Sequence, residues 1–116
     1  MLSLLVVLSG RSLPADAQMS PFNNGFNGTL SGDDLNAMMT AGQRLYGRNN
    51  VHNGANTTWS NPKTGNRGTI TVLQSFTERG MECRKVRYDN RVVNLEGVRS
   101  STLNWCKTPK GEWKIG

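Results

Sequence analysis

Two cysteines, placed symmetrically about a turn sequence, constrain the fold of this chain more than any other feature. Residues that face each other in an antiparallel hairpin are symmetric about its turn, and the midpoint between Cys83 and Cys106 falls inside Asn94–Gly97, which has the composition of a turn. The chain has two Cys and no CxxC or Cys/His cluster, which favours a structural bridge over a metal or redox centre. We therefore predict a disulfide between Cys83 and Cys106 across a hairpin.

Other segments of the C-terminal part also have the pattern of strands. Runs rich in β-branched and aromatic residues alternate with Pro-, Gly- and Asn-rich turns. Besides the strand that contains Cys106, this pattern predicts strands over residues 57–59, 68–76, 81–88 and 112–115. A strand-helix-strand alternation would indicate a parallel sheet, and the sequence shows no such alternation.

One amphipathic helix is expected before the strands. Ser31 stands three residues before Asp34, close to a capping box, and apolar residues follow at helical spacing over about Asp33–Tyr46. The chain of 116 residues suits one domain. The predicted fold is α+β, with one N-terminal amphipathic helix packed on a small antiparallel β-sheet of about four to five strands.

The first residues resemble an export signal. Leu2–Leu8 is an apolar run too short to span a membrane, Pro14 follows it, and Ala15–Ala17 supplies small residues for cleavage. The alternative is a buried N-terminal strand. We predict a signal peptide over residues 1–17, a flexible leader over 18–32 and the domain over 33–116, with an exported product, no transmembrane segment, and a periplasmic or outer-membrane-associated location.

Little in the sequence indicates catalysis. His52 is the one histidine, in an Asn-rich segment without a Ser or Cys nucleophile motif, and is best interpreted as a solvated loop residue. One His and two paired Cys do not supply a zinc site. A cell-wall-acting enzyme would need two carboxylates across a cleft, from Glu82, Glu96 and Glu112. We expect no enzyme activity, cofactor or metal.

A basic and aromatic group of residues is the strongest candidate for binding. The net charge of +6 attracts polyanions, although a solvated basic surface is the simpler interpretation. The candidate binding residues are Arg84, Arg87, Arg91, Trp105, Lys107 and Trp113. Strand alternation sends Arg84 and Lys85 to opposite faces, so only part of this set can share a surface, and we expect Trp113 to pack under the helix.

The C-terminal part resembles the 17 kDa outer-membrane surface antigen family of gram-negative bacteria. The resemblance is carried by Trp59-Ser60-Asn61-Pro62, Gly65-Asn66, Gly68-Thr69, Cys83-Arg84, Cys106-Lys107, Pro109, Gly111 and Trp113. It covers about Asp33–Ile115 and implies an envelope location and surface antigenicity, with no catalytic residues to transfer. The lipidated Cys and glycine zipper of many relatives are missing. Lys110 replaces the usual Asp and Trp105 the usual Ala, which suggests a repacked edge near Cys106.

These observations leave three functional hypotheses. The first is a non-enzymatic envelope protein that binds an envelope protein or an anionic envelope polymer through a basic and aromatic sheet surface; export makes nucleic acid an improbable partner. The second is a cell-wall-acting enzyme. The third is a secretion accessory or inhibitor protein that caps a partner's strand edge. A deep pocket with paired carboxylates would favour the enzyme, and a flat basic face would favour the binding protein.

Overall fold

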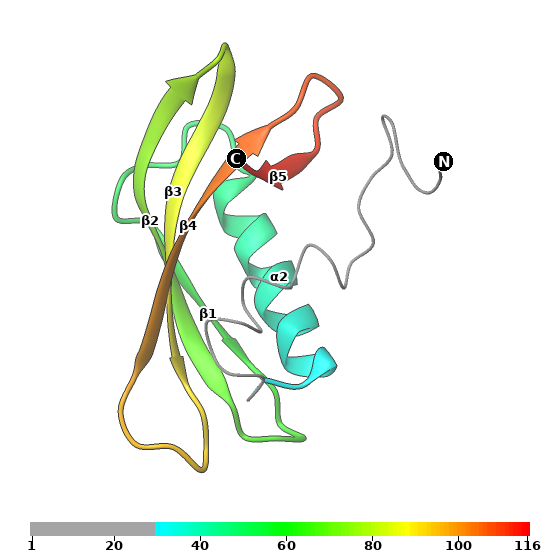
Figure 1. Ribbon diagram of the computed structural model, residues 1–116, viewed down its shortest axis with the longest axis vertical. Coiled ribbons are helices and arrows are strands. Elements are labelled where there is room, and N and C mark those ends of the chain that lie inside the picture. The colour runs from blue at the N-terminus through cyan, green and yellow to red at the C-terminus, as the bar shows by residue number, and fades with distance from the viewer. Residues whose placement is uncertain (1–29) are drawn as a thin grey trace.

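The computed structural model describes residues 30–116, in which one helix packs across one face of an antiparallel five-stranded sheet (Figure 1). The predicted α+β fold is confirmed. The elements are α2 (Gly32–Tyr46), β1 (Asn56–Ser60), β2 (Arg67–Glu78), β3 (Met81–Arg91), β4 (Arg99–Lys107) and β5 (Trp113–Ile115), and the strands lie in the sheet in chain order. The predicted signal peptide and the leader up to residue 29 lie outside the described residues.

The helix begins at the capping box that the sequence predicts. The Ser31 hydroxyl accepts a hydrogen bond from the Asp34 N–H at 3.1 Å, and the Asp34 carboxylate accepts one from the Ser31 N–H at 2.9 Å. Two of the backbone donors that a helix start leaves without partners are thereby satisfied. One stripe of α2, which includes Leu35, Met38 and Leu45, faces the sheet and is buried.

Alternation along the central strands builds the core under α2. Ile70 and Val86 on neighbouring strands are fully buried on the face that the helix covers. On the same face, the Trp105 indole stacks on the ring of Tyr46 with centroids 5.3 Å apart, and its Nε1–H donates to the Tyr88 hydroxyl at 2.7 Å. Helix and sheet are therefore joined by one continuous aromatic and aliphatic core.

The β3–β4 hairpin has the register that the cysteine positions predict. Cys83 lies directly opposite Cys106, and the two are joined by a disulfide with their Cα atoms 4.0 Å apart. The predicted bridge is confirmed in the structure. It joins residues 23 positions apart and fixes the sheet at the end near β5.

Residues 30–116 contain no helix that is long and apolar enough to cross a membrane.

Candidate functional site

The face of the sheet opposite α2 is the main exposed surface built by the strands, and we call it the open face. No other described helix or strand covers it (Figure 1). Strand alternation and register place on it a polar set of side chains: Thr58, Ser60, Arg67, Thr69, Thr71, Lys85, Arg87, Asp89, Arg91, Ser100 and Thr102. The open face is thus rich in hydroxyl and guanidinium groups, the groups that bind anions and sugars.

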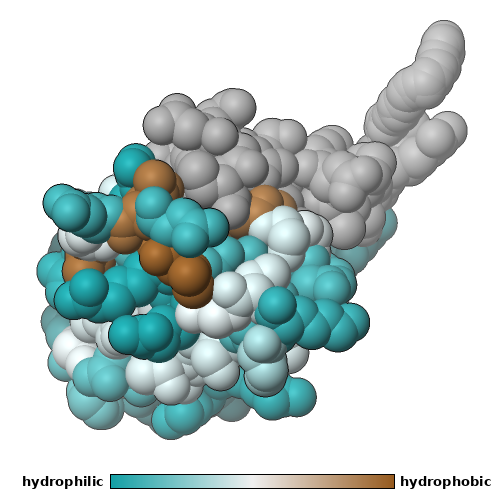
Figure 2. Space-filling model, turned by 90° about the horizontal axis from the view of Figure 1, so that it is seen from below, coloured by the Kyte–Doolittle hydropathy of each residue, from teal (hydrophilic) through white to brown (hydrophobic). Residues whose placement is uncertain are grey.

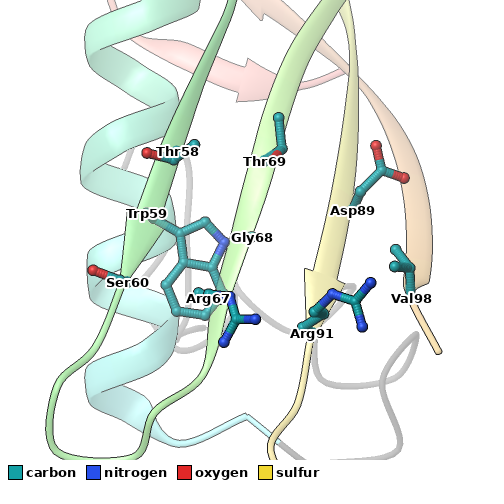
Figure 3. Close-up of a pocket in the computed structure, with 9 residues that line it drawn as sticks. All are labelled: Thr58, Trp59, Ser60, Arg67, Gly68, Thr69, Asp89, Arg91 and Val98. Atoms are coloured by element: carbon teal, nitrogen blue, oxygen red, sulfur yellow. The ribbon is translucent and has the colours of Figure 1, made fainter. Parts of the chain in front are cut away.

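A hollow of about 380 Å³ lies on the open face, across β1, β2 and β3 (Figure 3). It is lined by Thr58, Trp59, Ser60, Arg67, Gly68, Thr69, Asp89, Arg91 and Val98. In register, Ser60, Arg67 and Arg91 form one row across the three strands, and Thr58, Thr69 and Asp89 form the next. The hollow therefore has a cationic row beside a row of hydroxyls that ends in a carboxylate.

Two arginines of the cationic row occupy directly opposed positions on neighbouring strands. Arg67 and Arg91 are directly opposed residues of β2 and β3, and both are exposed. In Figure 3 the Arg67 guanidinium lies beside β2, and that of Arg91 extends from β3 toward Val98. Like charges in this arrangement destabilise a sheet. Neither arginine makes an ion pair with a described residue. A second hollow of about 180 Å³, toward the β3–β4 loop, is also lined by both arginines.

Asp89 does not neutralise this pair, because it is engaged elsewhere. Its carboxylate accepts hydrogen bonds from the Ser100 hydroxyl at 2.5 Å and from Arg87 Nε at 2.9 Å. The Ser100 hydrogen bond, with a further contribution from Arg87, lowers the pKa of Asp89 against the opposing effect of burial. Arg87 thus balances Asp89, and within residues 30–116 no acidic side chain forms an ion pair with Arg67 or Arg91.

Beneath the hollow, a side-chain hydrogen bond from β1 to β3 crosses β2 and joins the three strands. The Trp59 Nε1–H donates to Asn90 Oδ1 at 2.9 Å on the helix side of the sheet, directly over Gly68. A Cβ atom on Gly68 would lie 2.1 Å from that oxygen. Asn90 in turn donates to the Met38 sulfur at 3.4 Å. Only glycine fits between Trp59 and Asn90, and the floor of the hollow is anchored to the helix.

The end of the molecule beside the hollow also exposes apolar side chains. In the β3–β4 loop, Val93 is 60% and Val98 is 50% exposed. Figure 2, which views the molecule from below, shows a small hydrophobic area next to hydrophilic residues. Val98 lines the larger hollow and Val93 the smaller one, so each hollow has an apolar rim next to the arginines.

The structure separates the six candidate binding residues onto two sides of the sheet. Arg87 and Arg91 lie on the open face. Trp105 is buried against α2, and the half-buried Trp113 packs edge-on against Tyr46, under the helix as the sequence suggests. The remaining two, Arg84 and Lys107, are directly opposite Trp105 and Trp113 in register and so share their side of the sheet.

Arg84 is a core residue rather than a surface cation. Only 2% of its surface is exposed, and its guanidinium lies 5.1 Å from the ring centre of Trp113. It donates to the carbonyl oxygens of Cys83 at 3.1 Å and Arg48 at 3.3 Å, and it forms an ion pair with Glu82. These contacts join β3 to the end of α2 and to β5, so Arg84 has a structural role and does not reach the open face.

The turn motif between β1 and β2 also has a structural role. The buried Asp34 carboxylate accepts hydrogen bonds from Asn61 Nδ2 at 2.8 Å, the Thr64 hydroxyl at 2.7 Å and Asn66 Nδ2 at 2.8 Å. We call these residues, with the Ser31 cap, the Asp34 cluster. Burial would raise the pKa of Asp34, but its hydrogen bonds, that from Thr64 foremost, lower it instead. The cluster fastens the β1–β2 loop to the start of the helix.

The other titratable groups considered in the sequence lie outside the hollows. His52 is exposed in the loop before β1, with its Nδ1 3.0 Å from the carbonyl oxygen of Asn53. Glu82 is paired with Arg84, Glu112 forms an ion pair with Lys114, and Glu96 is in the β3–β4 loop. Within residues 30–116, no three His, Cys, Asp or Glu side chains gather at one point.

Comparison with known proteins identifies one family. A model of the 17 kDa outer membrane surface antigen family matches residues 49–114, more than half of the chain. No curated protein and no solved structure matches the chain significantly. The matched segment begins in the loop before β1 and ends in β5, so it includes the open face and both hollows.

Proposed function

This chain belongs to the 17 kDa outer membrane surface antigen family, and we propose from that membership and the geometry of the open face that it binds an anionic envelope polymer without catalysing a reaction. Family membership indicates association with the bacterial envelope. The proposal places the exported protein in the periplasm or at the outer membrane. The observation that carries it is the Arg67–Arg91 pair, two opposed cations without a described counter-charge on a polar surface that no other described helix or strand covers.

The contents of the hollow support binding rather than catalysis. Asp89 is its one carboxylate, whereas hydrolysis of a glycosidic bond ordinarily requires two that flank the bond. The carboxylates first considered for catalysis, Glu82, Glu96 and Glu112, are not among its lining residues. Several residues of the family motif, including Trp59 and Asn61, have structural contacts that account for their presence.

A retention experiment with purified envelope polymer tests the proposal. In one variant Arg67, Lys85 and Arg91 of the open face are all replaced by Gln. In the matched control Arg44, Arg48 and Lys110, all exposed and outside the open face, are replaced by Gln, so two Arg and one Lys are lost in both. Retention on lipopolysaccharide or another anionic glycan is measured as the salt concentration rises.

We expect the open-face variant to elute at clearly lower salt than the wild type, while the control elutes close to it, because local charge density rather than net charge holds the polymer. Equal loss in both variants would show that binding depends on net charge alone, and the proposal would be wrong. If both variants instead bound a partner protein equally well, the accessory or inhibitor hypothesis, in which a strand edge is used, would be favoured.

A further inference from the structure

We infer that the larger hollow is a site for a phosphorylated sugar unit, with Arg67 and Arg91 binding the phosphate and the neighbouring row of side chains binding the sugar. The inference rests on the proposed function and specifies the chemical group that is recognised. Its starting point is the arrangement of two rows across three strands, one cationic and one formed by hydroxyls and a carboxylate.

The arginine pair suits a phosphate group better than it suits a single carboxylate. A guanidinium presents several N–H donors in a plane and forms paired hydrogen bonds with phosphate oxygens. Arg67 and Arg91 occupy directly opposed positions, so both long side chains can turn toward one anion bound over this row, which removes their mutual repulsion. A phosphate has enough oxygens to accept from both groups at once. A carboxylate has two oxygens, and one guanidinium already satisfies them.

The next row has the groups that a sugar ring requires. Thr58 and Thr69 supply hydroxyls that both donate and accept hydrogen bonds. The Asp89 carboxylate is held by Ser100 and Arg87 and retains acceptor capacity for a sugar hydroxyl. Half-exposed Val98 offers an apolar surface to the C–H groups of a ring. The volume of about 380 Å³ lies in the range of small-molecule sites, about 300 to 1,000 Å³.

The lining residues argue against a nucleotide. Recognition of single-stranded nucleic acid depends on bases that stack on exposed aromatic side chains. Trp59 is the one aromatic residue of this lining, and it is 4% exposed with its indole N–H bonded to Asn90. A base would have no ring to stack on, whereas a sugar needs only the hydroxyl, carboxylate and aliphatic groups that are present.

A titration followed by amide NMR of the full chain tests the inference. Glucose 6-phosphate, inorganic phosphate and glucose are added separately to the wild-type protein. We expect the sugar phosphate to shift amides of residues 58–60, 67–69 and 89–91, and to bind several-fold more tightly than inorganic phosphate, while glucose alone binds weakest. Equal affinity for inorganic phosphate would refute sugar recognition, and shifts located elsewhere, or none, would refute the site.

Three single variants separate specific binding from diffuse attraction. Arg67→Gln and Arg91→Gln each remove one phosphate contact and are expected to weaken sugar phosphate binding by about tenfold or more. Lys110→Gln removes one charge from an exposed position outside the open face. It should change the affinity by less than about twofold. Equal weakening in all three would contradict the inference.

The source of the sugar phosphate is determined by competition. Lipopolysaccharide vesicles represent a lipid headgroup, and a soluble polymer of sugar phosphates represents a free glycan. Glucose 6-phosphate should displace the wild-type protein from its preferred source. If glucose 6-phosphate displaces the protein from neither source, the inference is wrong. If the open-face variant nevertheless fails to bind the polymer in the retention experiment, the proposed function stands without this site.

Discussion

Replacement of Asp34 by Asn tests whether the buried carboxylate holds the β1–β2 loop on the helix. Asp34 accepts hydrogen bonds from Asn61, Thr64, Asn66 and the Ser31 backbone N–H. Asparagine has nearly the same shape, but one of its two terminal groups is an NH₂ donor. At least one hydrogen bond is therefore lost and a donor faces another donor in a buried position.

The expected cost is large for a domain of this size. A hydrogen bond to a charged group contributes about 1.5 to 3 kcal/mol, and an unsatisfied buried donor costs a similar amount. Because the β1–β2 loop can take up water, we expect Asp34→Asn to lower the free energy of unfolding by about 3 kcal/mol, out of the 5 to 15 kcal/mol typical of whole domains. Asp33→Asn makes the same charge change one residue earlier.

Urea unfolding followed by tryptophan fluorescence measures both variants. The Asp33 carboxylate is 64% exposed and lies 3.7 Å from the exposed Lys63 ammonium, so its loss should cost less than about 0.5 kcal/mol. A difference of about 2 kcal/mol or more between Asp34→Asn and Asp33→Asn is the expected result. If the two variants lose equal stability, the cluster does not hold the loop and the reasoning fails.

The pH dependence gives a second test of the Asp34 cluster. The pKa of Asp34 is lowered in the folded state, so its contribution to stability is present above the unfolded pKa of about 3.9 and is lost as the pH falls through the folded value. Wild-type protein should therefore lose stability below about pH 4 more steeply than Asp34→Asn. The lowered pKa of Asp89 acts in the same direction but is common to both proteins. Parallel curves would contradict the assignment.

Further predictions concern the sheet. A Cβ on Gly68 would lie 2.1 Å from a side-chain oxygen on β3, so Gly68→Ala should cost about 3 kcal/mol, whereas Gly32→Ala, with nothing within 4 Å, should leave the melting temperature almost unchanged. Reduction of the Cys83–Cys106 bridge, which spans 23 residues, should lower stability by about 3 kcal/mol in urea unfolding with and without reductant. Arg91→Gln should raise stability by up to about 1 kcal/mol at low salt, and the gain should disappear near 1 M salt.

The fold was predictable because local patterns and one long-range constraint agreed. The capping box of Ser31 and Asp34 and the apolar stripe that follows predict the helix from adjacent residues alone. The symmetry of Cys83 and Cys106 about a turn predicts the register of β3 and β4, because that hairpin contains no bulge between the turn and the cysteines. Each of these features depends on a spacing that a sequence shows directly.

The position of Arg84 was harder to predict, because a charged residue occupies a core position of β3. Alternation places the side chains of Arg84 and Lys85 on opposite sides of the sheet. It does not show which of the two side chains points toward the helix. Burial of the guanidinium depends on Glu82 of the same strand and on two partners from distant segments, the Arg48 carbonyl and the Trp113 ring. No spacing within β3 reveals the two distant partners, so a surface role and a core role are equally compatible with the sequence of the strand.

Arg91 was predicted as a binding residue, but its pairing with Arg67 was missed, because β2 is irregular at residue 73. At the β2–β3 turn Glu78 pairs with Met81, and regular pairing from there would place Arg67 opposite Val92, with Arg91 on the other side of the sheet. The register shifts by one residue between Val72 and Gln74, and a one-residue shift exchanges the two faces. The bulge therefore brings both arginines to the open face. Any substitution that removed it would separate the pair while leaving both residues in the sheet, so the anion site depends on a feature that strand alternation cannot predict.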